Sequence, residues 1–398
     1  MRRIVCAGTV LLIICSFSPA QKLPVAKPED VGMSPARLNR AREVIIEAIA
    51  RKDFPGAVLL VGREGHIVFR EAFGHSQWIP ERKPMKAEMI FDIASITKPV
   101  ATASSIMILV EKGILSLSDR VKDFIPQFKA YRNRCGETAD HARLWHLCTH
   151  TSGLPAYMDP DEILQKHGSS VDTETIVRRI ARLEKTSPPG TAFHYSCLGY
   201  IALAHILEQV TGKSLDRFAG ENIFAPLKMD RTFFNPPQEL RHLCVPTEAI
   251  GGRPLIGVVH DPLARLQSGI SGNAGLFSTA DDLSVFAQMM LNKGLLSGRR
   301  ILSPLSVARM TSVFPAVGFS GRGLGWDLDS VYATCGGDLF GPNSYGHSGY
   351  TGTSIWIDPD TETFLIFLTN RVHPSDGGAI VAVRRYVANA VAASILEK

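Results

Sequence analysis

Ser95 and Lys98 are a pair of residues whose types and spacing could perform chemistry. A serine hydroxyl becomes a nucleophile when a neighbouring group removes its proton. The spacing places both side chains on one face of a helix that begins there, and Pro99 fits because proline is tolerated in a first turn. A lysine held against an apolar helix loses solvation, which lowers its pKa and lets it act as a base. The alternative is that Ser95 only caps the helix and Lys98 is a solvated side chain.

Tyr195 and His347 lie in two later segments that could contribute to the same chemistry. A tyrosine hydroxyl can take a proton from serine when nearby cations lower its pKa from about 10. His347 lies in the glycine-rich stretch 345–353, and glycines in a strand let a substrate approach the backbone closely. Each residue has a structural alternative, with Tyr195 as a core aromatic residue and His347 as a satisfied histidine within a turn.

The three segments together resemble the motif set of the serine β-lactamase and penicillin-binding-protein superfamily. The order and wide separation of the motifs match, namely Ser95 with Lys98, then Tyr195, then His347 with Gly349. The chain looks closest to the class C β-lactamase-like serine hydrolases, whose second motif is Tyr-x-Asn and whose third is Lys-Thr-Gly or His-x-Gly. Three flanking phrases also resemble this group: residues 145–155, 272–283 and 345–359. The resemblance runs from about residue 28 to the C-terminus and is closest to the exported penicillin-binding-protein-like and esterase-like branch.

The resemblance implies a serine acyl-transfer mechanism that needs no cofactor and no metal. Ser95 would attack a carbonyl and form an acyl-enzyme, while Lys98 and Tyr195 would share the proton transfers, with the identity of the general base left open. The backbone N–H groups of Ser95 and Tyr350 would form the oxyanion hole. The edge strand along which the substrate lies would include three consecutive residues: His347, Ser348 and Gly349.

Two positions depart from the family pattern, and both lie where a substrate would bind. Cys197 stands where the family usually has Asn, and a thiol is a weak hydrogen-bond donor and a poor acceptor. His347 stands where class C β-lactamases have Lys, and a neutral histidine gives no fixed charge for a substrate carboxylate, although histidine titrates near physiological pH. Both departures argue against efficient β-lactam hydrolysis.

Several functions remain open on this basis. The first is hydrolysis of an amide or ester, by a D-alanyl-D-alanine carboxypeptidase-like, β-lactamase-like or esterase activity, on a small molecule or peptide such as a peptidoglycan stem peptide or a β-lactam. The alternative, motivated by Cys197, is a catalytically weak protein that binds peptidoglycan peptides or penicillin. A net charge of +5 without a basic block gives no support to nucleic-acid binding.

Other candidate residues carry weaker signals. His146 and His150 have the four-residue spacing of a metal-binding pair but lack the glutamate of the HExxH pattern, so a metallohydrolase is disfavoured. His260 and Asp261 could form a base and its orienting partner, but adjacent residues on a strand face opposite sides, which favours a structural role. Asn273 is a candidate substrate contact.

The N-terminus and the cysteines point to export. Two arginines, an apolar stretch from Val10 to Phe17 and a small residue at Ala20 resemble a secretory signal peptide over residues 1–20, cleaved after Ala20. The mature protein, residues 21–398, would then be periplasmic or secreted. A retained membrane anchor and a lipid-modified Cys15 are alternatives. Five cysteines remain after cleavage, so at least one is unpaired within the chain, and Cys197 is the candidate.

Elements at both ends of the chain are predicted to position these residues. The fold class expected is α+β, with an antiparallel sheet built from both chain ends, flanked by helices in the β-lactamase/transpeptidase manner. A mainly helical lobe over residues 114–225 would be inserted in the sheet lobe. Predicted helices are 34–52, 201–212, 378–397 and a buried helix that begins near Ser95 and ends at 113; predicted hairpins are 56–74 and 353–370.

Overall fold

The structure is a computed structural model that describes residues 23–139 and 141–396. The predicted signal peptide, residues 1–20, lies outside the described residues. In the part of the chain that is described, no helix combines the length and the apolar character needed to cross a bilayer.

A six-stranded antiparallel sheet forms the centre of the fold, with strands in the order β11-β12-β13-β1-β2-β3. The strands are β1 (Gly56–Arg63), β2 (His66–Gln77), β3 (Lys83–Pro84), β11 (Tyr345–Ser348), β12 (Ser354–Asp358) and β13 (Thr363–Thr369). Strand β1 pairs with β13 from Ala57↔Thr369 to Arg63↔Thr363, so the two ends of the chain share one sheet. The predicted hairpins and the predicted α+β class are therefore confirmed.

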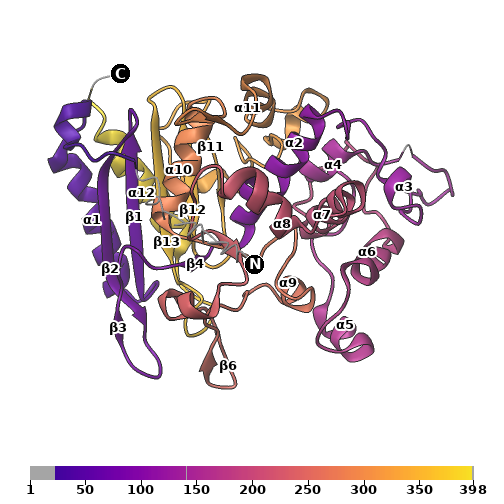
Figure 1. The fold of residues 1–398 in the computed structure, drawn as a ribbon, viewed down its shortest axis with the longest axis horizontal. Coiled ribbons are helices and arrows are strands. Elements are labelled where there is room, and N and C mark those ends of the chain that lie inside the picture. Colours follow the sequence, from indigo (N-terminus) through magenta and orange to yellow (C-terminus); the bar gives the residue numbers. More distant parts are fainter. Residues whose placement is uncertain (1–22, 140, 397–398) are drawn as a thin grey trace, which may run out of the picture.

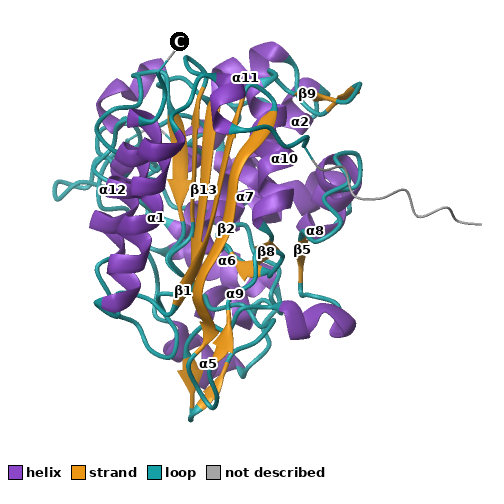
Figure 2. Cartoon of the chain, turned by 90° about the vertical axis from the view of Figure 1, so that its left-hand side faces the viewer, coloured by secondary structure: helices purple, strands orange, loops and turns teal. Residues whose placement is uncertain are grey.

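The sheet is buried on both faces, which explains the apolar character of its central strands. Along β1, Val58 and Leu60 pack into one hydrophobic core, while Leu59 and Val61 pack into another. Helices α1 (Pro35–Ala50) and α12 (Ile380–Ala393) cover one face, and α10 (Ala280–Leu291) covers the other, as Figure 2 shows. The predicted first and last helices are thus confirmed, with the last one shorter than predicted.

A group of helices, most of them short, gathers beside the sheet, away from β1 and β2 (Figure 1). They are α3 (Val121–Phe124), α4 (Leu144–Cys148), α5 (Pro160–His167), α6 (Thr173–Arg182), α7 (Cys197–Thr211) and α8 (Leu215–Ala219). Helix α7 begins earlier than the predicted 201, because Leu198 and Tyr200 are buried in the core that continues along its length. It ends as predicted, at a left-handed Gly212.

The remaining regular elements are brief. They are the helices α9 (Pro262–Leu266) and α11 (Pro304–Met310), a small sheet of β4 (Phe91–Asp92), β8 (Leu276–Ser278) and β5 (Phe233–Phe234), the ribbon β6 (Ala249–Ile250) with β7 (Arg253–Pro254), and the ribbon β9 (Leu295–Leu296) with β10 (Arg299–Arg300). The pairing of β4 with β8 fixes the segment that leads to Ser95.

The helix predicted to begin near Ser95 has an irregular start. A 3₁₀ turn, η2 (Ala94–Ile96), is followed by a π-helical segment, η3 (Lys98–Ala103), and only then by the α-helix α2 (Ser104–Glu111). The backbone enters η2 through Ala94, which has a left-handed φ of 47°. The Asp92 carboxylate accepts the Ala94 N–H at 2.9 Å and stabilises this turn. In the wide turn, the Ser104 hydroxyl donates to the Pro99 carbonyl at 2.7 Å.

Candidate active site

Lys98 is completely buried and points at Ser95 from the wide first turn of the central helix. Its Nζ donates to Ser95 Oγ at 2.9 Å and to the backbone carbonyl of Asn273 at 2.9 Å. The same Nζ lies 3.6 Å from Cys197 Sγ. Ser95 itself is partly exposed. The structure therefore brings together two residues of the first predicted motif and one of the second.

The pKa of Lys98 lies above its ordinary value, contrary to the sequence-based prediction. Burial acts to lower this pKa, as expected, and it is the largest single effect. The attraction of the nearby Cys197 and Tyr195 side chains, when they are ionised, together with Asp261, outweighs burial and raises the pKa of Lys98. Lys98 is therefore an ammonium ion at neutral pH, and not a ready proton acceptor.

Tyr195 faces the lysine from the segment that precedes α7. Its ring centre lies 5.1 Å from Lys98 Nζ. The ring stacks on the buried imidazole of His150, with centres 4.3 Å apart. His150 Nδ1 accepts the Ser196 N–H at 3.0 Å, which ties the histidine to the residue after Tyr195. Burial lowers the pKa of His150 well below its ordinary value, so this side chain is an uncharged platform that orients Tyr195.

The third motif lies on β11, the outer strand of the sheet. His347 is only 3% exposed, and its ring centre is 6.1 Å from that of Tyr195. Burial, followed by the positive charge of Arg322 and Lys98, lowers the pKa of His347 well below its ordinary value. The expectation that His347 titrates near physiological pH is therefore wrong, because the sequence did not reveal its burial or the neighbouring guanidinium.

Hydrogen bonds connect the third motif to the segment before Ser95. The hydroxyl of Thr351 donates to the Asp92 carbonyl at 2.7 Å, and that of Thr353 donates to the Ile93 carbonyl at 3.1 Å. Gly349 is required at this junction, because a Cβ there would collide with Thr353 Oγ1 and lie 2.5 Å from the Ile93 carbonyl oxygen. Ser95 and Tyr350 thus lie on two segments held in a fixed relation.

Arg384, on the helix α12, anchors the third motif, and none of the sequence motifs indicated it. Its buried guanidinium, on α12, donates to the carbonyls of Gly349 at 2.7 Å and Thr353 at 2.8 Å. Burial lowers the pKa of Arg384 to about 10. The signal in the sequence is an arginine on an otherwise apolar helix face, between Val383 and Val387.

Replacing Arg384 by methionine is expected to destabilise the fold. The substitution removes two charged hydrogen bonds to buried carbonyls, which then keep only their backbone donors, so the free energy of unfolding should fall by about 1–3 kcal/mol. Denaturant unfolding followed by circular dichroism measures this change. Arg385→Met is the matched control, because Arg385 is the exposed neighbour on the same helix and should change stability by about 0.5 kcal/mol or less. Equal stability of the two variants would contradict the anchoring role.

Cys197 lies in the site, and none of the five described cysteines is paired with another. The pairs that the sequence left open, among Cys135, Cys148, Cys244 and Cys335, are therefore not formed within the described chain. Burial raises the pKa of Cys197 above its ordinary value, although Lys98 opposes the shift. A neutral thiol is a poor nucleophile, so Ser95 is the better candidate for that role.

Asn273 and Asp261, two of the weaker candidates, each make hydrogen bonds that fix their positions. Asn273 is buried and binds Lys98 through its carbonyl, while its side-chain Oδ1 accepts from Ser271 Oγ at 2.8 Å. Asp261 caps α9 by accepting the Ala264 N–H at 2.8 Å, so the strand assumed for His260 and Asp261 is wrong.

The two histidines spaced like a metal-binding pair have separate surroundings. His146 accepts the Arg143 N–H at 2.9 Å and stacks on Trp145, whereas His150 stacks on Tyr195. Among the described residues, no group of three or more His, Cys, Asp or Glu side chains could hold a metal ion.

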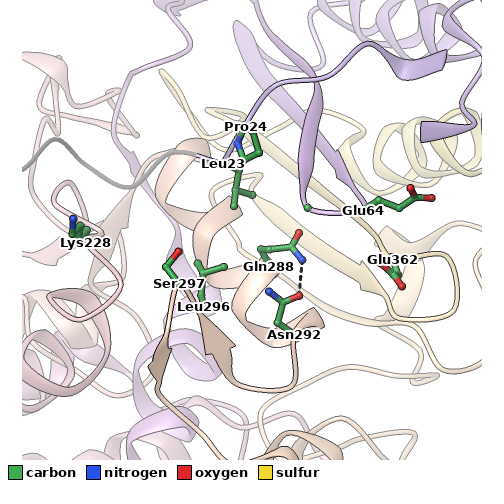
Figure 3. A pocket seen from close by; sticks show the side chains of 10 residues that line it. Leu23, Pro24, Glu64, Lys228, Gln288, Asn292, Leu296, Ser297 and Glu362 are labelled. Atoms are coloured by element: carbon green, nitrogen blue, oxygen red, sulfur yellow. Dashed lines mark hydrogen bonds between the residues drawn. The ribbon is translucent and has the colours of Figure 1, made fainter. Parts of the chain in front are cut away.

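A pocket of about 540 Å³ elsewhere on the surface does not include these residues (Figure 3). It lies beside the turn after β1, at Glu64 and Gly65, and beside the end of α10, where Gln288 donates to Asn292 at 2.9 Å. Glu362, in the turn after β12, is also part of its lining. Strand β13 runs from these turns to the other end of the sheet, where Thr369 Oγ1 donates to the carbonyl of Gly352, close in sequence to the third motif. This pocket is therefore not the site of Ser95.

Comparisons with known proteins identify a family model and relatives that match most of the chain. A family model described as "Beta-lactamase" matches residues 41–389. A protein of Bacillus subtilis (strain 168) named "N-acetylmuramyl-L-alanine amidase" is 32% identical, over 88% of this chain and 84% of its own length. A protein of Escherichia coli (strain K12), whose name includes the words "D-alanyl-D-alanine carboxypeptidase", is 30% identical, over 94% of this chain and 92% of its own.

Solved structures show the same fold. The structure named "EstCE1, a hydrolase with promiscuous acyltransferase activity" superposes with a TM-score of 0.72 at 22% identity, covering 90% of this chain and 99% of that one. A penicillin-binding protein homologue from Pyrococcus abyssi superposes with a TM-score of 0.67 at 26% identity, covering 89% and 76% of the two chains. These similarities show that the chain shares the fold of these proteins.

Proposed function

The chain belongs to the beta-lactamase family and is a serine hydrolase, and on that premise we propose that it hydrolyses an amide or ester through an acyl-enzyme at Ser95. The observation that carries the proposal is the 2.9 Å hydrogen bond between Lys98 Nζ and Ser95 Oγ at the start of a buried helix. A nucleophile in contact with its proton-transfer partner is the arrangement that serine acyl transfer requires.

Lys98 and Tyr195 divide the proton transfer in this proposal. Because the pKa of Lys98 is raised, the lysine stays positive and favours negative charge on the neighbouring oxygens. The Lys98–Tyr195 pair takes up the Ser95 proton at the phenolic oxygen of Tyr195 as the bond from Ser95 Oγ to the substrate carbonyl carbon forms. Tyr195 then returns the proton to the leaving group. A water molecule activated near Tyr195 completes hydrolysis of the acyl-enzyme.

The substrate would lie along β11. The backbone N–H groups of Ser95 and Tyr350 would stabilise the oxyanion, because the hydroxyls of Thr351 and Thr353 hold these two segments together. His347, Ser348 and Gly349 would line the strand. Tyr350 is 56% exposed, and its hydroxyl donates to the Asp376 carboxylate.

D-alanyl peptides and esters are the substrates we propose, ahead of β-lactams. The amide that the family usually has at position 197 is replaced by a thiol, and the imidazole at position 347 carries no charge. Two groups that would bind the amide and the carboxylate of a β-lactam are therefore weak here. The carboxypeptidase and amidase names of the relatives support peptidoglycan stem peptides as one substrate class.

A location outside the cytoplasm, periplasmic or secreted, fits this substrate class. The support comes from the sequence of residues 1–20, which has the basic, apolar and small-residue regions of a signal peptide. Sequencing the N-terminus of the exported protein would show whether cleavage follows Ala20.

An activity screen tests the proposal. Wild-type protein and Ser95→Ala are compared on nitrocefin, p-nitrophenyl esters and peptides that end in D-Ala-D-Ala. The proposal expects hydrolysis of at least one of the last two classes by wild type and none by Ser95→Ala. Turnover that persists in Ser95→Ala would overturn it.

A catalytically weak binding protein is the second candidate, favoured by the contact of Cys197 with Lys98 at 3.6 Å. In that case, well-folded wild-type protein would bind stem peptides in calorimetry but show no turnover in the screen and no labelling by a fluorophosphonate probe.

Cys197→Asn is expected to shift the substrate preference toward β-lactams. An amide at this position can donate and accept a hydrogen bond beside Lys98, so the rate of acylation by nitrocefin should rise about tenfold relative to ester hydrolysis. Stopped-flow absorbance measures both rates. Cys197→Ser, which has no amide, is the matched control. An unchanged ratio of the two rates in Cys197→Asn would show that position 197 does not select the substrate.

A further inference from the structure

Arg322 is a buried cation in the wall of the site that the motif analysis did not identify. It is only 1% exposed, and its guanidinium carbon lies 5.4 Å from the ring centre of Tyr195. The rings of Phe193 and Tyr332 complete a box around it, at 5.5 and 5.8 Å. Its single ion pair is with Asp327, at 3.1 Å from Nη2. Within the described chain, Nε and Nη1 have no hydrogen-bond partner.

This arrangement is costly if it serves only the fold. A buried guanidinium loses its hydration, and apolar residues of similar size usually fill such a position at least as stably as an ion pair does. Cation–π contacts with the three rings return part of that cost. The unpartnered donors show that the hydrogen bonds of Arg322 are incomplete. Its position behind Tyr195 is therefore better explained by its charge than by its packing.

The charge of Arg322 is fixed relative to the third motif. Its partner Asp327 pairs with Gly346 on β11 through two backbone hydrogen bonds of 2.9 Å. Gly346 directly precedes His347, which is uncharged. The strand that carries the third motif thus holds, through Asp327, a permanent positive charge beside Tyr195. That charge comes from a residue that lies outside the motif.

We propose that Arg322 is a positioning residue that acts through Tyr195, supplying beside its ring the fixed positive charge that His347 does not carry. Together with Lys98, it keeps positive charge beside the Tyr195 oxygen that takes up the Ser95 proton. This inference rests on the proposed function. It predicts that the charge is needed for acylation and that the same charge placed at position 347 can substitute for it.

Charge removal and charge relocation test the proposal. The first variant, Arg322→Met with Asp327→Asn, removes the cation without leaving an unpaired buried carboxylate. Asp327→Asn alone is the matched control. The second variant adds His347→Lys to the first. The rate and half-saturation concentration of acylation by a fluorophosphonate probe are measured for each protein, and circular dichroism confirms folding. Arg322→Gln with Asp327→Asn replaces the first variant if that variant does not fold.

The acylation rate of the first variant is expected to be roughly tenfold or more below that of Asp327→Asn. The guanidinium carbon of Arg322 lies 5.4 Å from the ring centre of Tyr195, and at an effective dielectric constant of about 20 a unit charge at that distance changes a rate by at least that factor. The half-saturation concentration should stay within about twofold. His347→Lys should restore most of the lost rate, which a merely structural role of Arg322 would not allow.

Two results would overturn the inference: an acylation rate in the first variant equal to that of Asp327→Asn, or no recovery with His347→Lys. Failure of the proposed function looks different, because wild-type protein would then not be labelled at Ser95 at all.

Discussion

Lys98→Ala is expected to lower the rate of acylation of Ser95 by at least ~10²-fold, as positioned proton-transfer groups typically contribute. The substitution removes the ammonium ion that donates to Ser95 Oγ at 2.9 Å and that lies 5.1 Å from the ring centre of Tyr195. Single-turnover kinetics with a p-nitrophenyl ester at saturating concentration measure the acylation step separately from product release.

Lys98→Arg separates the charge from the shape of the lysine. The longer, planar guanidinium keeps the positive charge but cannot make the same three contacts with Ser95, Asn273 and Cys197. We expect it to recover only part of the rate. Near-normal acylation by well-folded Lys98→Ala would contradict the role of Lys98 in proton transfer.

Tyr195→Phe is expected to lower acylation by a similar factor, at least ~10²-fold, because the proton acceptor is lost while the ring and its stacking on His150 are kept. The free energy of unfolding should therefore change little. Both quantities are measured on the same preparation, by burst kinetics and by denaturant unfolding.

The matched control is Tyr386→Phe, which removes the hydroxyl of an exposed tyrosine on α12. It should acylate at the wild-type rate. If Tyr195→Phe also acylated at that rate, Tyr195 would not be the proton acceptor, and Lys98 would have to accept the proton despite its raised pKa.

Local sequence patterns predicted the main helices and strands well, because burial produces apolar runs in strands and periodically spaced apolar residues in amphipathic helices. The apolar run of β13 indicated a central strand, and the strand is buried along its whole length. The Ser34 cap with Pro35 indicated the start of α1 correctly. The 3₁₀ turn at Ala94 and the wide turn at Lys98 were not predictable, because no propensity encodes the hydrogen bonds of Asp92 and Ser104 that stabilise them.

The electrostatics of the site depended on long-range contacts and were predicted wrongly in two places. For Lys98, the sequence indicated burial but not the attraction of Cys197 and Tyr195, which reverses the direction of the pKa shift. For His347, it indicated neither the burial that is the main cause of the lowered pKa nor the charge of Arg322, which comes from a loop that only the fold brings near. Arg384 was missed for the same reason, although its place on an apolar helix face was a readable signal.

The most direct test of the account is to locate the acyl or phosphonyl adduct by peptide mass spectrometry after labelling with a fluorophosphonate. The predicted adduct is on Ser95, in the peptide that also contains Lys98, and it is absent from Ser95→Ala. Alkylation of Cys197 before labelling should leave the Ser95 adduct in place. Any decrease in its amount would come from the alkyl group blocking the approach of the probe to Ser95. An adduct on Cys197, or labelling that persists in Ser95→Ala, would contradict a mechanism in which Ser95 is the nucleophile.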